Sequence, residues 1–285
     1  MHSAQELVAH IEGLASLPTV YLRIREELDS ENCSLAEVAR IIAADPALSA
    51  RVLHVVNSAL YGYGGRIDTI QRAVTILGLQ QVHDLVLAMS IGSVFQNVKP
   101  EHMNMKRFWQ GSVMCGLAAR EIGQRIKQAN PERLLTIGLL SDLGHLVMYQ
   151  TVPHLAEEAQ VHADASATPL YQAERKIVGC DYAEVGATLA QQWKLPVCFA
   201  QAIGAQVNPR LGGEFITEAS VLNIAAQIIA ADRSGEASDA AAGRIDPLVW
   251  AQVGLAPADF GALRETAELQ LASYIAVLFP ATPLR

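Results

Sequence analysis

Asp142 and His145 are the two side chains of this sequence whose types and spacing best suit metal chemistry. Residues three apart on a helix share a face, and a carboxylate oxygen with an imidazole nitrogen can bind a transition metal. Such an ion activates water for hydrolysis. Two ligands make a weak site, and no H-x-x-x-H pair occurs among the other histidines. A metal-dependent enzyme would need further carboxylates, for which the candidates are Glu174, Asp181 and Glu184.

The composition is typical of a globular chain with an acidic surface. Of 285 residues, 51% are hydrophobic and 18% are charged, and the net charge is −8 at pH 7. Binding to nucleic-acid phosphates favours a basic face, so we expect no nucleic-acid partner. No G-x-S-x-G, Walker or Rossmann glycine motif is present, and the sequence therefore predicts no cofactor and no conventional active site.

The cysteines and the hydropathy pattern indicate the compartment. The four cysteines form no C-x-x-C pair, so neither a zinc finger nor a redox motif is predicted. Unpaired thiols are typical of a reducing cytoplasm. The first residues lack the basic and apolar regions of a signal peptide, and no apolar run reaches about 18 residues. We expect a soluble, cytoplasmic protein with no membrane partner.

The local pattern is almost entirely helical. Asn or Asp before Pro marks helix starts at Asp45-Pro46 and Asn130-Pro131, and Thr168-Pro169 predicts the same device. Ser34 with Glu37, and Asp181 with Glu184, predict capping boxes. We expect a connection between two lobes at 97–104 and a loop at 234–243. The expected helices lie near 5–14, 19–29, 35–43, 46–57, 69–77, 80–95, 104–128, 131–150, 154–163, 169–178, 182–192, 196–206, 215–232, 246–253 and 258–279.

Several motifs in the first hundred residues carry a family resemblance. Asp45-Pro46-Ala47-Leu48 is followed by Asn57-Ser58-Ala59-Leu60-Tyr61-Gly62 and then by Arg72-Ala73-Val74-Thr75-Ile76-Leu77-Gly78. In this order and spacing the motifs resemble the HDOD domain, a bacterial signalling module related to HD-type metal-dependent phosphohydrolases. The resemblance continues from about residue 108 to 207. It implies an all-α fold, with an N-terminal helical lobe (about 1–100) packed on an HD-like bundle (about 101–211) and C-terminal helices (212–285).

The resemblance also shows which residues occupy the metal-binding positions of the enzyme relatives. A metal-binding histidine there follows a Trp by two residues, and Gly111 follows Trp109 here. The His-Asp pair becomes Ser141-Asp142, a D-H-A-E-V-G run carries Tyr182 in place of histidine, and a later histidine-bearing turn ends in Gln206. Only Asp142 remains, and one carboxylate cannot replace three to six ligands. The resemblance therefore implies a pseudo-phosphohydrolase with no metal and no catalytic residue.

A vacated active site can persist as a ligand pocket. Small residues on the helix near 104–128 indicate either close helix packing or such a cavity; they are Gly111, Ser112, Cys115, Gly116 and Ala119. Asp142 is alternatively a buried carboxylate that the fold satisfies internally. The predicted pocket residues are Gly111, Ser141, Asp142, His145, Tyr182 and Gln206.

Two segments are candidates for a partner surface. Asn57, Ser58 and Tyr61 form either a recognition loop or a helix end with a packing tyrosine. Lys106 and Arg107 begin a locally basic helix that also carries Arg120, Arg125 and Lys127. Such a run either docks an acidic partner or is a solvated helix face.

These features favour a non-catalytic signal-transduction or regulatory module that acts through protein partners. One alternative is a metal-dependent phosphohydrolase acting on a nucleotide or cyclic dinucleotide. The other is a receptor for a nucleotide or small molecule that uses the vacated pocket. The sequence predicts no particular partner, ligand or oligomeric state.

Overall fold

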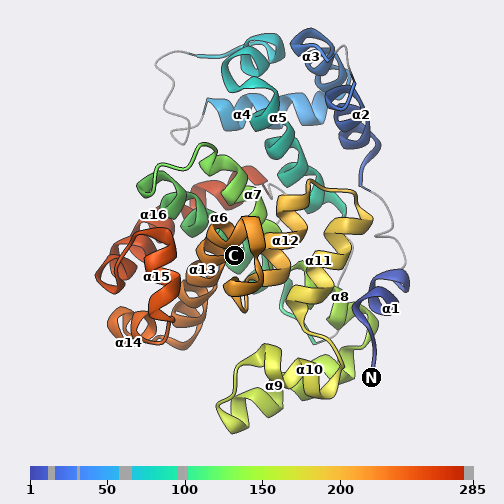
Figure 1. Cartoon of the computed structure of the whole chain (residues 1–285). Coiled ribbons are helices and arrows are strands. Elements are labelled where there is room, and N and C mark those ends of the chain that lie inside the picture. Colours follow the sequence, from blue (N-terminus) through green and yellow to red (C-terminus); the bar gives the residue numbers. More distant parts are fainter. Residues whose placement is uncertain (12–16, 31–32, 58–65, 95–99, 101, 279–285) are drawn as a thin grey trace. The chain divides into compact units, whose positions relative to one another are not determined.

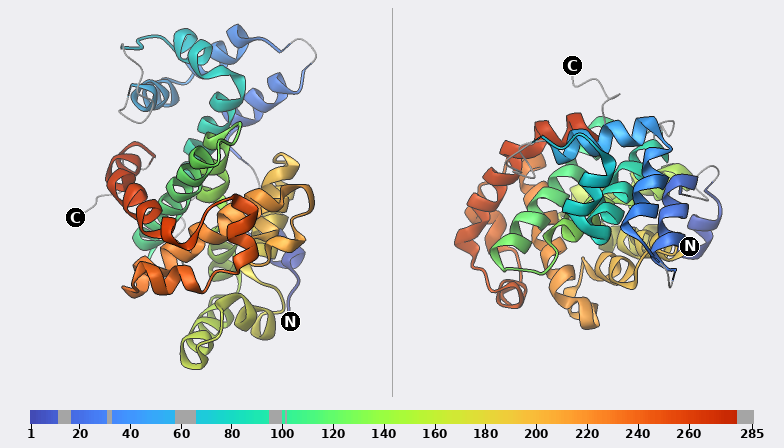
Figure 2. Two further views of the ribbon diagram at one scale, coloured as in Figure 1. Left: turned by 60° about the vertical axis from the view of Figure 1, so that its left-hand side comes forward. Right: turned by 90° about the horizontal axis from the view of Figure 1, so that it is seen from above.

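The computed structural model describes residues 1–11, 17–30, 33–57, 66–94, 100 and 102–278. Every regular element in these ranges is a helix (Figures 1 and 2), which confirms the predicted all-α class. The chain divides into two compact units. Unit 1 comprises Met1–Ala15 and Val98–Ala272, and unit 2 comprises Ser16–Asn97 and Ser273–Arg285.

The unit boundary at residues 97 and 98 lies within the segment expected to join two lobes, but the N-terminus differs from the expected 1–100 lobe. Helix α1 (Ala4–Ala9) belongs to unit 1. The His2 amide donates a hydrogen bond to the Val178 carbonyl at 2.7 Å, and Leu7 and Val8 are buried. These long-range contacts outweigh proximity in sequence.

Unit 2 is built on helices whose ends are encoded locally. Asp45 accepts hydrogen bonds from the amides of Ala47 and Leu48, as the Asp-Pro pair predicts. Gly78 has φ of 77°, a conformation that favours glycine, and it separates the two helices expected on either side of it. The helices of this unit are α2 (Thr19–Leu28), α3 (Leu35–Ala43), α4 (Pro46–Val56) and α5 (Ile70–Val94, bent at Gly78).

Unit 1 holds α1 and the helices that follow residue 104, except the last part of α16 from Ser273, which belongs to unit 2. Tight packing of α6 against α7 depends on two glycines: a Cβ on Gly116 would lie 2.6 Å from the Leu135 carbonyl oxygen, and one on Gly138 would lie 2.8 Å from the Gly116 Cα. The helices are α6 (Met105–Arg125), α7 (Pro131–Leu140), α8 (Leu143–Thr151), α9 (Pro153–Ser166), α10 (Leu170–Ile177), α11 (Tyr182–Gln192), α12 (Val197–Ala205), α13 (Ile216–Ser234), α14 (Ser238–Gly243), α15 (Pro247–Val253) and α16 (Phe260–Leu278).

The structure corrects two helix predictions in unit 1. The single helix expected at 131–150 is two helices, because the chain turns at Ser141 and Asp142, where the Ser141 hydroxyl donates to the Gly138 carbonyl at 2.8 Å. The loop expected at 234–243 contains α14, which buries Ala241 and Ala242. Both errors follow from tertiary packing, which overrides weak local propensity.

Three predicted caps have different outcomes. The Asp181–Glu184 capping box is present in full. Ser34 caps α3, but Glu37 does not bond back to it, because the Glu37 carboxylate pairs with Arg40 and the Ser34 amide donates to Glu27. Thr168 does not cap α10, since Ala167 adopts a left-handed conformation and the helix begins one residue after Pro169.

Two described helical stretches, Ile70–Ser90 and Gly213–Ser234, are long and apolar enough to cross a membrane by length and composition. The first is 67% buried and the second 44% buried within the molecule. Core helices of water-soluble proteins have the same length and hydropathy, so these two helices are weak evidence for a membrane span.

Candidate functional site

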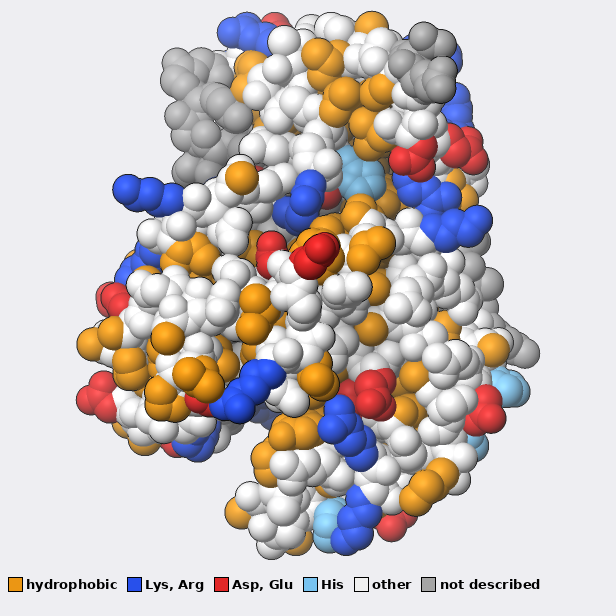
Figure 3. Space-filling view, viewed as in Figure 1, with side chains coloured by type: hydrophobic (Ala, Val, Ile, Leu, Met, Phe, Trp, Pro, Cys, Tyr) orange, Lys and Arg blue, Asp and Glu red, His pale blue; other side chains and the backbone are white. Residues whose placement is uncertain are grey.

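A cavity of about 1140 Å³ opens in unit 1. Its walls come from α6, the α7–α8 turn, the starts of α10 and α11, the end of α12, α13 and the α14–α15 segment. Figure 3 shows this side of the molecule hollowed between the α9–α10 hairpin below and the C-terminal helices, with Lys or Arg side chains at the rim. The six predicted pocket residues all line it: Gly111, Ser141, Asp142, His145, Tyr182 and Gln206.

His145 lies between two carboxylates. Its Nδ1 contacts Oδ1 of Asp142, the residue that precedes α8, and its Nε2 lies 2.9 Å from Oε1 of Glu174 on α10. The second contact is an ion pair without hydrogen-bond alignment. Burial alone lowers the pKa of His145, but the two carboxylates more than offset it and raise that pKa to about 10. His145 is therefore an imidazolium at neutral pH.

The other atoms of these carboxylates are engaged by the protein. The Tyr182 amide donates to Oε2 of Glu174 at 3.0 Å, and Oδ2 of Asp142 lies 4.0 Å from Nη2 of Arg233. Burial raises the pKa of Asp142, but the charges of His145 and Arg233 together lower it by more, so the net shift of this pKa is downward. The Tyr182 ring stacks on the imidazole with centroids 4.1 Å apart.

Arg233 fills the space beside Gly111. A Cβ built on Gly111 would lie 2.5 Å from Nη2 of Arg233. The guanidinium thus lies where a longer side chain at position 111 would begin. Gly144 makes a closer backbone contact, since its Cβ would lie 1.8 Å from the Tyr182 carbonyl oxygen.

Ser141 and Gln206 are part of a buried hydrogen-bond chain. The Ser141 hydroxyl lies 3.3 Å from the Cys115 sulfur, and since that hydroxyl donates to Gly138, it accepts from the thiol. Gln206 donates to the Ser141 carbonyl at 2.8 Å, and Asn223 donates to the Gln206 carbonyl at 2.7 Å. Burial raises the pKa of Cys115 to about 12, so this thiol is a poor nucleophile.

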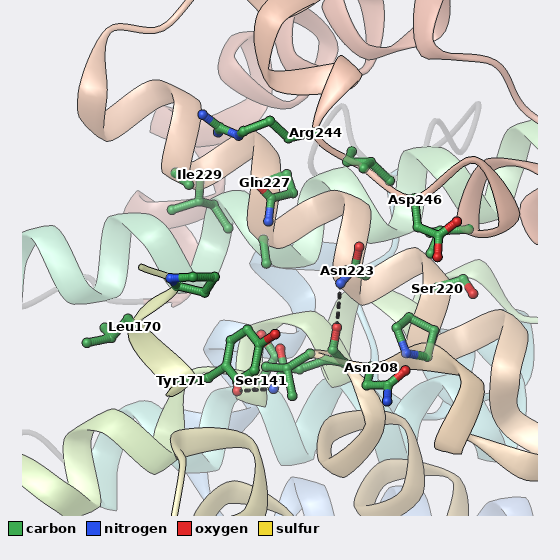
Figure 4. Close-up of a pocket in the computed structure, with 18 of the residues that line it drawn as sticks. Ser141, Leu170, Tyr171, Asn208, Ser220, Asn223, Gln227, Ile229, Arg244 and Asp246 are labelled. Carbon is green, nitrogen blue, oxygen red and sulfur yellow. Dashed lines mark hydrogen bonds between the residues drawn. The ribbon is translucent and has the colours of Figure 1, made fainter. Parts of the chain in front are cut away.

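The outer part of the cavity, between α10, α13 and the α14–α15 segment, carries several polar side chains among apolar ones and was not predicted from the sequence. Asn223 and Gln227 point into it from α13, and Tyr171 faces them from α10 (Figure 4). Arg210 pairs with Asp246 at 2.8 Å, and Arg244 pairs with Glu236. Arg233, with its longer 4.0 Å contact, has the looser carboxylate partner of the three arginines.

Divalent metal does not fit the inner site. The imidazole directs its two nitrogens at different carboxylates, so Asp142, His145 and Glu174 cannot surround one ion in this arrangement. Two protein cations, the buried His145 and the more exposed Arg233, already offset the Asp142 charge. The other candidate ligands do not line the cavity: Asp181 pairs with Arg175 at 2.7 Å, and Glu184 completes the capping box.

The candidate partner residues are placed elsewhere. The Asn57 side chain donates to the carbonyls of Leu53 and Ile67 and accepts from the Ile67 amide, which supports its helix-ending alternative. Ser58 and Tyr61 lie outside the described residues. Lys106 is half-buried and Arg107 is exposed. The basic helix is not a uniform solvated face: Arg120 is 8% exposed and pairs with Glu132, and Arg125 pairs with Glu121.

Comparison with solved structures shows the same fold in several bacterial proteins. An HDOD domain protein of unknown function from Geobacter sulfurreducens superimposes with a TM-score of 0.77, at 22% identity and 97% coverage of both chains. A protein from Shewanella amazonensis SB2B named "Putative phosphohydrolase" gives 0.73, at 26% identity over 97% of this chain and 98% of that one. One from Marinobacter aquaeolei VT8 named "Putative signal transduction protein" gives 0.69, at 20% identity over 98% of this chain and 61% of that one.

The sequence comparisons agree. A protein from Treponema pallidum (strain Nichols), named "Uncharacterized protein", is 28% identical over 195 residues. The match covers 68% of this chain and 37% of that protein, so the chain spans well under half of its relative. The family model described as HDOD domain matches residues 14–209. The motifs, the helical fold and this match together place the chain in the HDOD domain family, which is related to HD phosphohydrolases.

Proposed function

We propose that this chain is a non-catalytic regulatory module, a pseudo-phosphohydrolase that acts in bacterial signalling through protein partners. The observation that carries the proposal is the charge network in the inner cavity. The imidazolium of His145 lies between Asp142 and Glu174, and the guanidinium of Arg233 lies beside Gly111. Protein cations thus satisfy the carboxylates that would otherwise attract a metal ion.

Hydrolysis by the HD mechanism needs a metal-activated water. Binding a divalent ion at Asp142 would require His145 to lose its proton and turn away from at least one carboxylate. It would also place the ion near the positive charge of Arg233. Both changes oppose metal binding. The name of the Marinobacter aquaeolei relative agrees with a signalling role.

The first experiment measures metal that depends on Asp142. Protein purified without chelator is dialysed against Mn²⁺, and its metal content and hydrolysis of nucleotides and cyclic dinucleotides are compared with those of Asp142→Asn. We expect the same metal content in both proteins and no turnover. One or more ions per chain, lost in Asp142→Asn together with hydrolysis, would overturn the proposal and establish the phosphohydrolase alternative that the Shewanella amazonensis name suggests.

A second candidate function, a receptor for an anionic small molecule such as a nucleotide, is favoured by the outer cavity. The whole cavity, at about 1140 Å³, is large enough for a ligand of that size. Asn223, Gln227 and Tyr171 offer hydrogen bonds, and Arg233 offers a positive charge with a loosely held partner. Ligand binding could then be the signal that a partner protein reads.

The receptor is tested by thermal denaturation with mono- and dinucleotides. A true ligand at 100 times its dissociation constant stabilises the fold by about 2.7 kcal/mol without turnover. Arg233→Ala should weaken binding by about 10-fold, the effect of losing about 1.4 kcal/mol. Arg107→Ala, which removes an exposed arginine outside the cavity, is the matched control. Equal effects of the two variants would exclude the cavity as the binding site.

A further inference from the structure

Three side chains that can ligate a metal meet on the surface of unit 1, outside the cavity. Nδ1 of His102 lies 3.2 Å from Oε1 of Glu157, and the His102 and His154 rings have centroids 5.8 Å apart. One donor atom from each of the three residues lies within 4.8 Å of the others. Among the described residues, no other group of three His, Cys, Asp or Glu side chains brings its donor atoms this close together.

The positions of two helix starts create this cluster. His154 and Glu157 are three residues apart at the beginning of α9, so they share one face of the helix. His102 lies just before Asn104, whose side chain caps α6. The cluster thus joins the segment that leads into α6 to the first turn of α9.

We propose that His102, His154 and Glu157 form a binding site for a transition-metal ion of the Zn²⁺ type. Two imidazoles and one carboxylate are a ligand set that zinc accepts, with water in the fourth position. Donor atoms around a tetrahedral zinc ion are separated by about 3.3 Å. The three donor atoms here lie within 4.8 Å of one another, so small side-chain rotations would bring them to that spacing. The His102 and Glu157 side chains are 30% and 48% exposed, which gives an ion and its water ligand free access.

The second histidine distinguishes a metal site from a simple ion pair. An exposed His–Glu pair contributes little to stability and needs no third group. Here the His154 ring is placed beside the pair, and its nitrogen completes the set of three donors. The bound ion would link His102, in the segment before α6, to His154 and Glu157 on α9. The stability of this contact would then depend on the metal.

Isothermal titration of untagged full-length protein with Zn²⁺ alone tests the site. We expect one saturable equivalent per chain. His102→Ala and His154→Ala should each weaken binding by at least about 10-fold, the lower end of the effects seen for mutations around metal sites. Zn²⁺ should raise the melting temperature of the parent protein and raise that of His154→Ala clearly less at the same Zn²⁺ concentration.

His162→Ala is the matched control, because His162 also lies on α9 but outside the cluster. Cys33→Ser tests the half-buried thiol as a competing ligand. Asp142→Asn should leave Zn²⁺ binding intact, which separates this site from any metal in the cavity. The absence of saturable binding, or binding that His154→Ala leaves unchanged, would overturn the proposal.

Discussion

Nη2 of Arg233 lies 2.5 Å from the point where a Cβ at Gly111 would be. In the resemblance that the sequence carries, position 111 corresponds to a metal-binding histidine. The guanidinium of Arg233, on α13, therefore occupies the space beside the Gly111 backbone. The guanidinium is at the end of the flexible Arg233 side chain, which is 44% exposed, so it can move aside at low cost.

Gly111→Ala and Gly144→Ala should accordingly differ strongly. At Gly111 the new methyl group comes too close only to the mobile guanidinium and makes an ordinary contact with Ile229. Because alanine is favoured over glycine in a helix by about 1 kcal/mol, we expect little loss of stability. At Gly144 the methyl group meets the Tyr182 carbonyl at 1.8 Å, which is backbone. We expect a loss of about 3 kcal/mol or more from overpacking. Urea denaturation of both variants measures the difference, and equal losses would contradict it.

His145→Gln should destabilise the fold by about 3 kcal/mol, because it leaves Asp142 and Glu174 without their shared cation. Asp142→Asn should cost less, since His145 keeps Glu174 as its partner. Chemical denaturation of the two variants, followed by circular dichroism, checks this order. A larger loss in Asp142→Asn would mean that Glu174 is not an effective partner.

The contribution of His145 should also depend on pH. Its pKa is about 10 in the folded chain and about 6.5 in an unfolded one. The stabilisation is therefore fully present below pH 6.5 and is lost as pH rises through 10. The pKa of Asp142 is lowered, so its contribution is present above its unfolded pKa and is lost only in acid.

The measurement is the difference in unfolding free energy between the parent protein and His145→Gln at pH 6, 8 and 10. We expect this difference to shrink steadily toward pH 10. A difference that stays constant across this range would mean that His145 is neutral in the folded protein.

Asn57→Ala should weaken unit 2 locally. The Asn57 side chain bonds both the amide and the carbonyl of Ile67, at 2.7 and 2.6 Å, and Ile67 is 2% exposed. Loss of these bonds leaves buried backbone groups unpaired and costs about 2 kcal/mol. Hydrogen exchange should show a faster Ile67 amide, while amides of α13 keep their protection. Unchanged exchange at Ile67 would show that water replaces the asparagine.

Local signals accounted for most of the helices. The Asp-Pro and Asn-Pro starts, the Asp181–Glu184 box and the break at Gly78 are all decided within about one helical turn, where the chain interacts with itself. The same range could not reveal the turn at Ser141 and Asp142. That turn is fixed by a side-chain bond to Gly138 and by contacts to Cys115 and Gln206, which come from α6 and α12.

The sequence by itself determined the all-α class, the HDOD resemblance and six of the residues that line the cavity, because these depend on residue identity and order along the chain. Only the tertiary structure decided what surrounds those residues. Glu174 approaches His145 from α10, Arg233 approaches Gly111 from α13, and His102 meets His154 across a wide interval of sequence. The distance between charged side chains on separate helices depends on how those helices pack. Residue spacing along one segment of the chain does not encode that distance.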